Sequence, residues 1–249
     1  MLLEERLDEI VKIVNERGSI SNQELVKMFG ASESTIRRDI TTLANDNRVI
    51  RVHGGAMSVV SGGGMEDSEV SARRIQNSDE KIKIAKYAAS LINEGDLVYI
   101  DAGSTTLHMV EYLKEEEAIY VTNGLEHGRR LAAQGFRTFL LAGELKSRTE
   151  AVVGLGAVSS LQKYNFNKAF FGTNGITVDS GFTTPDTNEA YVKMEAMKHA
   201  QKCYILADSS KFGTCTSITT ADISDATIIT GKGVEKEYLE EADIIEVEE

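Results

Sequence analysis

The 249-residue sequence predicts an α/β chain in which a small helical domain with a hairpin precedes a larger domain built on a largely parallel sheet. In residues 1–57, apolar residues recur at helical spacing and then alternate with polar residues over a short segment. Residues 58–77 are rich in glycine and show no periodicity. In residues 78–249, short apolar runs alternate with amphipathic helices, which is typical of a parallel sheet covered on both faces. We therefore expect two domains joined by a linker at 58–77.

The small domain begins with two short helices. Leucine, isoleucine and valine recur at helical spacing over residues 3–14, and Gly18 ends that helix. Ser21 and Glu24 stand at capping-box spacing, which places the start of a second helix there, and Gly30 ends it.

A third helix and a hairpin complete this domain. Ser32 is placed to cap the helix, whose inner face carries Ile36, Ile40 and Leu43. Residues 49–55 then alternate apolar and polar before a double glycine, which is typical of a short strand and turn. Two helices separated by a glycine turn and followed by a strand and turn predict a winged helix-turn-helix.

The larger domain is predicted to be Rossmann-like. Its helices are expected near residues 79–93, 105–115, 125–134, 154–162, 187–201 and 234–241. Apolar runs bounded by turn residues predict strands at 97–100, 118–121, 138–141, 169–171, 203–207, 227–229 and 244–247. The regular alternation favours a largely parallel, doubly covered sheet.

The composition excludes several classes of protein. With 27 basic and 39 acidic side chains, the net charge of −12 excludes a chain that coats nucleic acid through bulk positive charge. Residues 1–57 carry only −1 of this charge, so the acidity belongs to the larger domain. No apolar stretch is long enough to span a membrane, and the acidic start MLLEERLDEI is unlike a signal peptide, so we expect a cytoplasmic protein. The two cysteines and four histidines lack metal-ligand spacing, and we expect neither a metal nor another cofactor.

Arginine and hydroxyl side chains gather on the outer face of the third helix. Because its apolar side chains face inward, Arg37 and Arg38 lie where they can reach DNA phosphates and guanine edges, and Asp39 is expected to orient one of them or to bridge to it. Arg48 extends the positive surface toward the hairpin, and residues 27–53 carry a net charge of +2. The candidate DNA contacts are Ser21, Ser32, Ser34, Thr35, Arg37, Arg38, Thr41, Arg51 and His53.

Several motifs resemble those of the DeoR family of bacterial transcriptional regulators. In the small domain they are STIRRDI at 34–40 and RVHGGA at 51–56. In the larger domain they are DAGSTT at 101–106, TN at 122–123, LAGE at 141–144 and ADSSKFG at 207–213. Together they cover nearly the whole chain in the family's order. Asn47 stands where we expect a glycine before the wing, and asparagine tolerates the left-handed backbone that glycine allows.

The residues after the first predicted strand of the larger domain suit a phosphate. Asp101 ends that strand, and residues 103–106 open a helix with free backbone N–H groups and hydroxyl side chains. Lys146, Arg148 and Lys211 add cations from the ends of other strands, where open α/β sheets bind ligands.

The resemblance extends this site. It implies a larger domain similar to ribose-5-phosphate isomerases and CoA transferases, which in the DeoR regulators senses a phosphorylated sugar. It also implies pocket residues at Asn123, Gly172, Asn174, Gly175 and Glu189, and Asp208 and Glu189 are able to accept sugar hydroxyls. The candidate effector contacts are Asp101, Gly103, Ser104, Thr105, Thr106, Asn123, Lys146, Arg148, Gly172, Asn174, Gly175, Glu189, Asp208 and Lys211.

Three functions are compatible with these residues. The favoured one is a repressor of a carbohydrate-utilisation operon that a phosphorylated sugar releases from its operator, with no catalytic residue. It binds paired half-sites about 34 Å apart as a dimer or tetramer. The alternative is a sugar-phosphate isomerase, because Asp101, Glu189 and Lys211 could serve proton transfer beside a carbonyl, although an isomerase needs no reader domain. A protein adaptor is the third, and it lacks a large exposed apolar stripe in the sequence.

Overall fold

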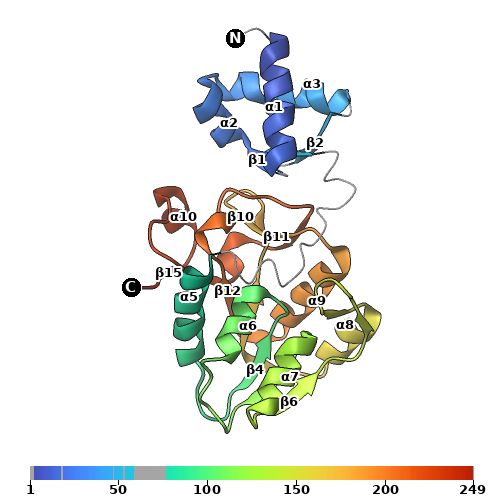
Figure 1. The fold of residues 1–249 in the computed structure, drawn as a ribbon, viewed down its shortest axis with the longest axis vertical. Helices are drawn as coiled ribbons and strands as arrows, with labels where there is room; N and C mark the ends of the chain where they lie inside the picture. Colours follow the sequence, from blue (N-terminus) through green and yellow to red (C-terminus); the bar gives the residue numbers. More distant parts are fainter. Residues whose placement is uncertain (1–2, 18, 47, 53, 59–76, 249) are drawn as a thin grey trace.

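A computed structural model describes residues 3–17, 19–46, 48–52, 54–58 and 77–248 of the chain. It has a small N-terminal domain seated on one end of a larger α/β domain (Figure 1). The small domain contains α1 (Leu3–Arg17), β1 (Ser19–Ser21), α2 (Asn22–Phe29), α3 (Glu33–Asn45), β2 (Val49–Val52) and β3 (Gly55–Ser58). The three helices and the hairpin predicted from the sequence are confirmed.

One strand of the small domain was not predicted. β1 pairs antiparallel with β3, so that the wing is a three-stranded sheet in the order β1-β3-β2. Three residues are too few to show an alternating pattern, and only Ile20 of this strand joins the apolar core. A Cβ on Gly55 would lie 2.3 Å from the carbonyl oxygen of Ile20, so this pairing requires glycine at position 55.

The predicted caps are present in the helix-turn-helix. The Ser21 hydroxyl accepts a hydrogen bond from the Glu24 N–H at 3.2 Å, and the Glu24 carboxylate accepts one from the Ser21 N–H at 3.0 Å. Gly30 ends α2 with a left-handed backbone, φ 61°. The inner face of α3 is also as predicted, since its three apolar side chains are fully buried in the core between the helices.

The larger domain is built on one seven-stranded sheet. Its main helices are α5 (Ser78–Ser90), α6 (Ser104–Val110), α7 (Leu125–Ala133), α8 (Leu155–Leu161), α9 (Thr187–Lys198) and α10 (Lys236–Glu241). The sheet strands are β4 (Leu97–Ile100), β5 (Ile119–Thr122), β6 (Arg137–Leu140), β9 (Phe166–Gly172), β12 (Ala200–Leu206), β14 (Thr227–Thr230) and β15 (Ile244–Glu246). Every pairing in this sheet is parallel, in the order β15-β14-β12-β9-β4-β5-β6, which confirms the predicted architecture.

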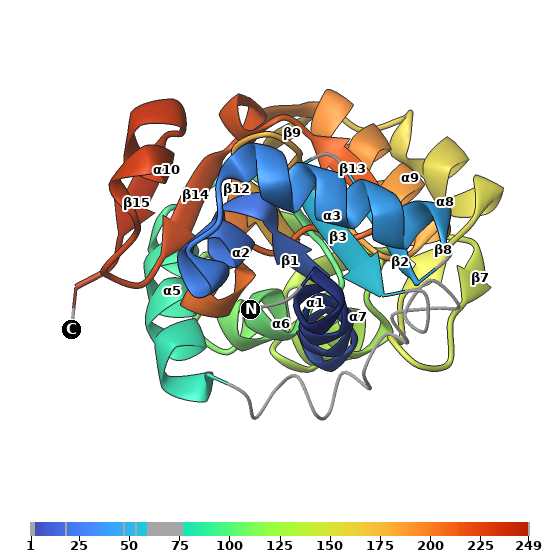
Figure 2. The same ribbon diagram turned by 90° about the horizontal axis from the view of Figure 1, so that it is seen from above.

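Alternate side chains of the sheet face two separate cores. Val98 and Ile100 of β4 pack with α5, α6 and α7, whereas Tyr99 between them packs with α8 and α9 on the other face. Both faces are covered by helices in the views of Figures 1 and 2. No helix of the described residues is long and apolar enough to cross a membrane.

Several short elements of the larger domain were not predicted. They are β7 (Glu144–Leu145), β8 (Val152–Val153), β10 (Gly175–Thr177), β11 (Gly181–Thr184), β13 (Ile218–Ala221), and the 3-10 turns η1 (Ser209–Lys211) and η2 (Ile223–Asp225). β7 pairs with β8, and β10, β11 and β13 form a second antiparallel sheet. These elements are two to four residues long, which is too short for a periodic pattern, and β10, β11 and β13 are also rich in threonine and glycine.

The order of the strands creates a switch point beside β4. The chain moves from β4 outward through β5 and β6, and then returns to pair β9 with the opposite edge of β4. Loops from neighbouring strand ends therefore diverge between β4 and β9, which is where open α/β sheets bind ligands.

Candidate functional site

Two adjacent arginines lie exposed on α3. The Arg37 guanidinium is 63% exposed and contacts the Glu33 carboxylate at 2.6 Å, one turn earlier on the same helix. Arg38 is exposed as well. In Figures 1 and 2, α3 lies on the side of the small domain that faces away from the larger domain. This helix face is therefore open to a large partner such as a DNA duplex.

The structure corrects one expectation about charge near α3 and adds a contact to another residue. Asp39 bonds neither neighbouring arginine, because it is 4% exposed and accepts two hydrogen bonds from Arg6 of α1, at 2.7 and 3.2 Å. The prediction that it orients or bridges Arg37 or Arg38 is wrong, because the apolar inner face turns this carboxylate toward α1. Arg48 contacts Asp8 at 2.6 Å, so it ties the start of the wing to α1 as well as adding charge.

The other candidate DNA contacts have varied surroundings. Ser32 caps α3 by accepting from the Thr35 N–H at 3.2 Å, and the Thr41 hydroxyl donates to the Arg37 carbonyl at 2.7 Å. Ser34 and Arg51 are exposed, whereas Ser21 lines a cavity that faces the larger domain. His53 and Asn47 lie outside the described residues.

A buried ion pair occupies the switch point of the sheet. Asp101 follows β4, is 1% exposed, and accepts hydrogen bonds from the Lys193 ammonium and, at 3.2 Å, from the Gly172 N–H. The Lys193 ammonium also donates to the Gly172 carbonyl at 3.0 Å. A Cβ on Gly103 would lie 3.7 Å from the Gly172 Cα, so the two glycines face each other beside this pair.

Lys193 was not predicted. It lies in the middle of α9, where the sequence gives no signal that separates a buried lysine from a solvated one. Burial raises the pKa of Asp101, against the attraction of Lys193 that lowers it. A buried carboxylate and ammonium at a sheet switch point are typical of a ligand site, since desolvating both is costly for stability alone.

Several polar groups near the predicted turn after β4 form hydrogen bonds within the protein. The Thr106 hydroxyl donates to the Asp101 carbonyl at 2.6 Å and also lies 3.1 Å from the His127 ring. The Asn123 amide oxygen accepts from the Ala102 N–H at 2.8 Å. Thr105 is buried, and Ser104 is half-buried at the start of the seven-residue helix α6.

A second group of charges extends from the switch point along α9. Glu189 lies one helical turn before Lys193, and its carboxylate accepts from the Lys146 ammonium at 2.9 Å and from the Thr149 hydroxyl at 2.8 Å. Lys146 also contacts Asp186, the cap of α9, at 3.1 Å. Lys146 and Thr149 belong to the β7–β8 hairpin, which thus reaches α9 through this group.

The remaining predicted effector contacts lie at separate positions in the larger domain. Arg148 is exposed on the same hairpin. Asn174 accepts from the Thr184 hydroxyl at 3.2 Å. Gly175 serves a close approach of two backbones, because a Cβ there would lie 2.2 Å from the Thr214 carbonyl oxygen.

A third group of charges surrounds Asp208, which follows β12. Its Oδ1 accepts from the Asn77 amide at 2.8 Å and from Ser210, and its Oδ2 lies 3.7 Å from the Lys81 ammonium and 3.6 Å from that of Lys211. Burial works to raise the pKa of Asp208, but Lys211, Ser210, Asn77 and Lys81 together lower it. Asn77 and Lys81 were not predicted. The sequence signal that could have indicated them is an asparagine and a lysine one helical turn apart at the start of α5.

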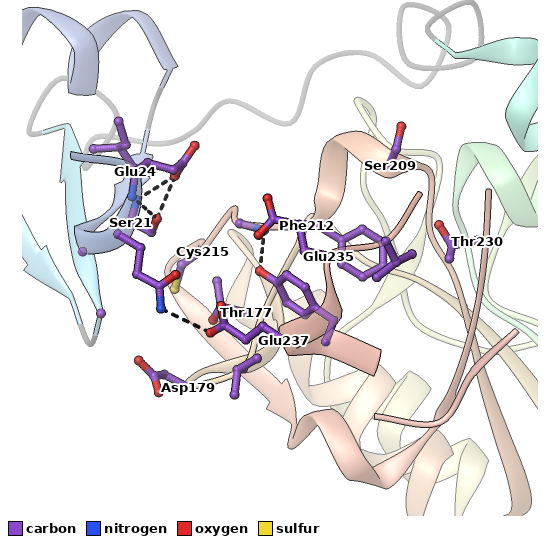
Figure 3. Close-up of a pocket in the computed structure, with 18 of the residues that line it drawn as sticks. Ser21, Glu24, Thr177, Asp179, Ser209, Phe212, Cys215, Thr230, Glu235 and Glu237 are labelled. Atoms are coloured by element: carbon purple, nitrogen blue, oxygen red, sulfur yellow. Dashed lines mark hydrogen bonds between the residues drawn. The ribbon is translucent and has the colours of Figure 1, made fainter. Parts of the chain in front are cut away.

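A cavity of about 270 Å³ separates the two domains (Figure 3). On the small-domain side, Gln23 of α2 donates to Glu237 at 3.2 Å, and Lys27 lies 3.9 Å from Glu235. None of the predicted effector contacts lines this cavity, but four neighbours of Lys211 in sequence do, namely Ser209, Phe212, Gly213 and Cys215. The cavity therefore lies between the helix-turn-helix and the loop that carries the Asp208 group.

That loop is fixed by Tyr238 of α10. Its hydroxyl accepts from the Gly213 N–H at 2.9 Å, and its ring packs edge-on against Phe212 with the centroids 5.0 Å apart. Within the described residues, no group of three or more His, Cys, Asp or Glu side chains is arranged to hold a metal ion.

Comparison with known proteins agrees with both domains. Residues 6–61 match the DeoR-like helix-turn-helix domain, and residues 76–232 match the DeoR C terminal sensor domain. The chain belongs to the DeoR family. The winged helix-turn-helix and the Rossmann-like larger domain expected from the sequence are thus the reader and sensor domains of a DeoR-family transcriptional regulator.

Relatives match over most of this regulator's length. It is 42% identical to the "Uncharacterized HTH-type transcriptional regulator FruR" of Bacillus subtilis over 92% of this chain and 91% of that one. It is 35% identical to the "Lactose phosphotransferase system repressor" of Staphylococcus aureus over 84% of each chain. It is 36% identical to the "HTH-type transcriptional regulator GlpR" of Haloferax volcanii, with 86% of this chain and 83% of that one covered.

The chain is also similar to the solved structure of an enzyme. Ribose 5-phosphate isomerase A from Methanocaldococcus jannaschii shares 18% identity with the chain, with a TM-score of 0.40 and 55% of each chain covered. The family and the three relatives above are transcriptional regulators and not enzymes, so the isomerase alternative is not retained.

Proposed function

We propose that this DeoR-family regulator is a sequence-specific repressor of a carbohydrate-utilisation operon, and that a phosphorylated sugar releases it from its operator. The observation that carries the proposal is the set of lysines held against carboxylates at the carboxyl edge of the sheet. Lys81, Lys146 and Lys193 each have such a partner there. This edge lies in the domain that matches the DeoR sensor.

DNA is read by the exposed face of α3. One of Arg37 and Arg38 reaches a guanine edge and the other a phosphate, with Ser34 and Thr35 as further phosphate contacts. The exposure of both arginines and the position of α3 away from the larger domain support this assignment. Arg51 adds a contact from the wing.

The phosphate of the effector binds at the Asp208 group. There, Lys81 and Lys211 bring two positive charges to one carboxylate, whereas Lys193 and Lys146 are outweighed by Asp101, Asp186 and Glu189. A phosphate dianion is therefore favoured beside Lys81 and Lys211. This differs from the site expected at residues 103–106, because α6 is short and the Thr106 hydroxyl is already bonded.

The sugar extends from this phosphate toward the switch point. β12 and β4 are separated by one strand, so their ends lie about 10 Å apart at the usual strand spacing. Asp101 and Glu189 at the far end are carboxylates suited to accept sugar hydroxyls. Lys193 holds Asp101 in place for this contact.

The effector signal reaches the reader through the loop after Asp208. This loop carries Lys211 and continues to Gly213, which is fixed by Tyr238 beside the inter-domain cavity. A shift of the loop changes how α2 rests on the sensor. Because an effector moves an equilibrium only by differential affinity, an inducer binds the DNA-released arrangement more tightly.

The regulator acts as a homo-oligomer in the cytoplasm. Paired half-sites about 34 Å apart are read by two α3 helices related by two-fold symmetry. The acidic sensor domains then repel DNA away from the reading surface, which limits unspecific binding.

A thermal-shift screen of the full chain tests the effector assignment. Fructose, tagatose and glycerol phosphates are compared with the unphosphorylated compounds and with inorganic phosphate. A true effector at 100 times its Kd stabilises the fold by about 2.7 kcal/mol. Lys211→Ala removes this shift and Lys198→Ala, an exposed lysine of α9, retains it. Stabilisation by none of the phosphates, or equal stabilisation of the Lys211→Ala variant, contradicts the site.

A further inference from the structure

Part of the predicted DNA-contact surface faces the sensor domain. In a helix-turn-helix, the recognition helix enters the major groove while the helix before it crosses the phosphate backbone. Ser21 caps α2, the helix before α3, and is one of the predicted DNA contacts. Ser21 and Gln23 nevertheless line the cavity between the two domains, as does Gly54 in the turn of the wing between β2 and β3. The α3 face is therefore open to DNA, whereas the surface beside it is covered.

The start of α2 and the wing turn form one surface. The Asn22 N–H donates to the Gly54 carbonyl at 2.7 Å, which joins the two segments. A helix start carries unpaired N–H groups and the positive end of the helix dipole, and both favour a DNA phosphate. Lys27 adds a cation in the last turn of α2. We call this set the flanking surface, and its members are Ser21, Asn22, Gln23, Lys27 and Gly54.

Two carboxylates at the start of α10 lie against α2. Gln23 donates to Glu237 at 3.2 Å, and the Lys27 ammonium lies 3.9 Å from the carboxylate of Glu235, the residue before α10. Figure 3 shows Glu237 at the cavity, with Ser21 on the reader side. The Lys27 and Glu235 side chains are 69% and 66% exposed, and contacts between groups this exposed are weak. The docked arrangement can therefore open.

A third carboxylate lies against the wing turn. A Cβ on Gly54 would lie 3.1 Å from the carboxylate of Asp179, which is exposed in the turn between β10 and β11. Lys232, which lines the sensor side of the same cavity, contacts Glu248 at 3.8 Å. The sensor thus presents mainly negative charge to the flanking surface, as a DNA backbone does.

We propose that the sensor inhibits DNA binding by placing Asp179, Glu235 and Glu237 where DNA phosphates bind the reader. While the reader is docked, a duplex on α3 loses its contacts to α2 and to the wing turn. Tight DNA binding therefore requires the reader to leave these carboxylates. The inference rests on the proposed DNA-binding function and deepens it, because it identifies the docked arrangement as the DNA-released one.

The loop that carries Lys211 supports the docked reader. A Cβ on Gly213 would lie 3.9 Å from the Glu24 carboxylate of α2, and the Gly213 N–H donates to the Tyr238 hydroxyl. An effector that binds more tightly when this loop lies against α2 therefore favours the docked arrangement and releases DNA.

A disulfide that locks the reader in place tests the proposal. G54C/D179C is suited to this, because a Cβ on Gly54 would lie 3.9 Å from the Asp179 Cβ, as in an ordinary disulfide. The full chain also carries C215S, since Cys215 lines the same cavity. A non-reducing gel shows that the bond forms within one chain.

Binding of a labelled duplex of random sequence is then measured at low ionic strength, where phosphate contacts supply the affinity. The oxidised protein is expected to bind at least about tenfold more weakly than the same protein after reduction, because phosphate contacts of the reader are withheld. G54C/C215S and D179C/C215S are the controls, and each is expected to bind equally before and after reduction.

A pair of charge variants gives a second test that leaves Gly54 in place, whose φ of 82° strains other residues. E235Q/E237Q is expected to bind the duplex several-fold more tightly than the matched control E240Q/E241Q. The control removes the same charge from exposed residues of α10 that do not line the cavity. It therefore separates release of the reader from a general loss of negative charge.

Weaker binding by the locked protein, with tighter binding by E235Q/E237Q than by its control, supports the proposal. Equal binding by the oxidised and reduced protein, absence of the disulfide in folded protein, or equal binding by the two charge variants overturns it. A reduced protein that does not bind the duplex overturns the DNA-binding function as well. The duplex carries no operator and no sugar is added, so failure of the proposed operator or effector leaves these results unchanged.

Discussion

Lys193 is a buried cation of the sensor that the sequence does not indicate. Its ammonium is buried against Asp101 and the Gly172 carbonyl, where its attraction lowers the pKa of Asp101 against the burial that raises it. The sequence identified Asp101 from its place after a strand, but it gave no sign of Lys193. The difference is physical, because a strand end is marked by neighbouring residues, whereas the burial of one helical lysine depends on which strands lie beneath it.

Removing Lys193 tests this pairing. Lys193→Met leaves the Asp101 carboxylate buried without its cation, and we expect a loss of about 3–5 kcal/mol in the free energy of unfolding at neutral pH. Lys193→Met/Asp101→Asn removes both charges and is expected to recover most of that loss. Urea unfolding of the three proteins measures the effect. A double variant no more stable than the single one would mean that the pair is not coupled.

A substitution of Arg38 tests DNA binding by the reader domain. Arg38→Ala is expected to weaken operator binding by about 1–3 kcal/mol, or roughly five- to 150-fold, while effector binding stays unchanged. Lys12→Ala on α1, which removes an exposed cation outside α3, is the matched control. Fluorescence anisotropy with labelled operator and a thermal-shift assay give the two readouts. Equal weakening by both variants would show that only unspecific charge is lost.

At the scale of elements, long periodic segments could be predicted and short ones could not. All seven strands of the parallel sheet and the caps of α2 and α3 follow from local patterns. β1 depends on β3, which lies far away in sequence, whereas β7 and β10 form local hairpins with β8 and β11 whose strands are too short to show an alternating pattern.

The link between α6 and α7 gives a pH-dependent prediction. Arg129 first, and then Arg130, hold the pKa of Glu126 down to about 2, from its usual 4.5. Arg130 also contacts Glu111 at 2.6 Å, just after α6. Because the folded pKa is lowered, the carboxylate stabilises the fold above pH 4.5, and that stability is lost as the pH falls toward 2.

Glu126→Gln measures this contribution. The pair is partly exposed and screened, so we expect a loss of about 1 kcal/mol at pH 7, or roughly 2–4 °C in Tm. The difference from the wild type should shrink as the pH is lowered from 4.5. Glu240→Gln, at an exposed pair on α10, should change Tm little at any pH. A difference that persists unchanged at low pH would assign the effect to packing and not to charge.

At the scale of the whole molecule, the sensor and the reader meet at a cavity and a few polar contacts. Tyr238 lies on the sensor side, where it fixes the loop that leads from the Asp208 group. The sequence predicted both domains but not this contact, because it joins residues from α2, the 209–215 loop and α10.

Tyr238→Phe tests the route between the two sites. It removes the hydroxyl that accepts from Gly213 and keeps the ring beside Phe212. We expect nearly unchanged affinity for operator and for effector measured separately. The factor by which the effector weakens operator binding should fall several-fold, since coupling is a free energy shared by both sites. If coupling between effector and operator binding is unchanged in a folded variant, the Tyr238 hydroxyl does not transmit the signal.

The most direct test of the account is operator release by a phosphorylated sugar. Anisotropy of labelled operator is followed with the full chain while fructose, tagatose or glycerol phosphates are added, each beside its unphosphorylated form. The account predicts specific, salt-dependent binding that one phosphorylated sugar reverses and its unphosphorylated form does not. It also predicts that Lys211→Ala binds operator but no longer responds. Binding without sequence preference, or release that survives Lys211→Ala, would contradict it.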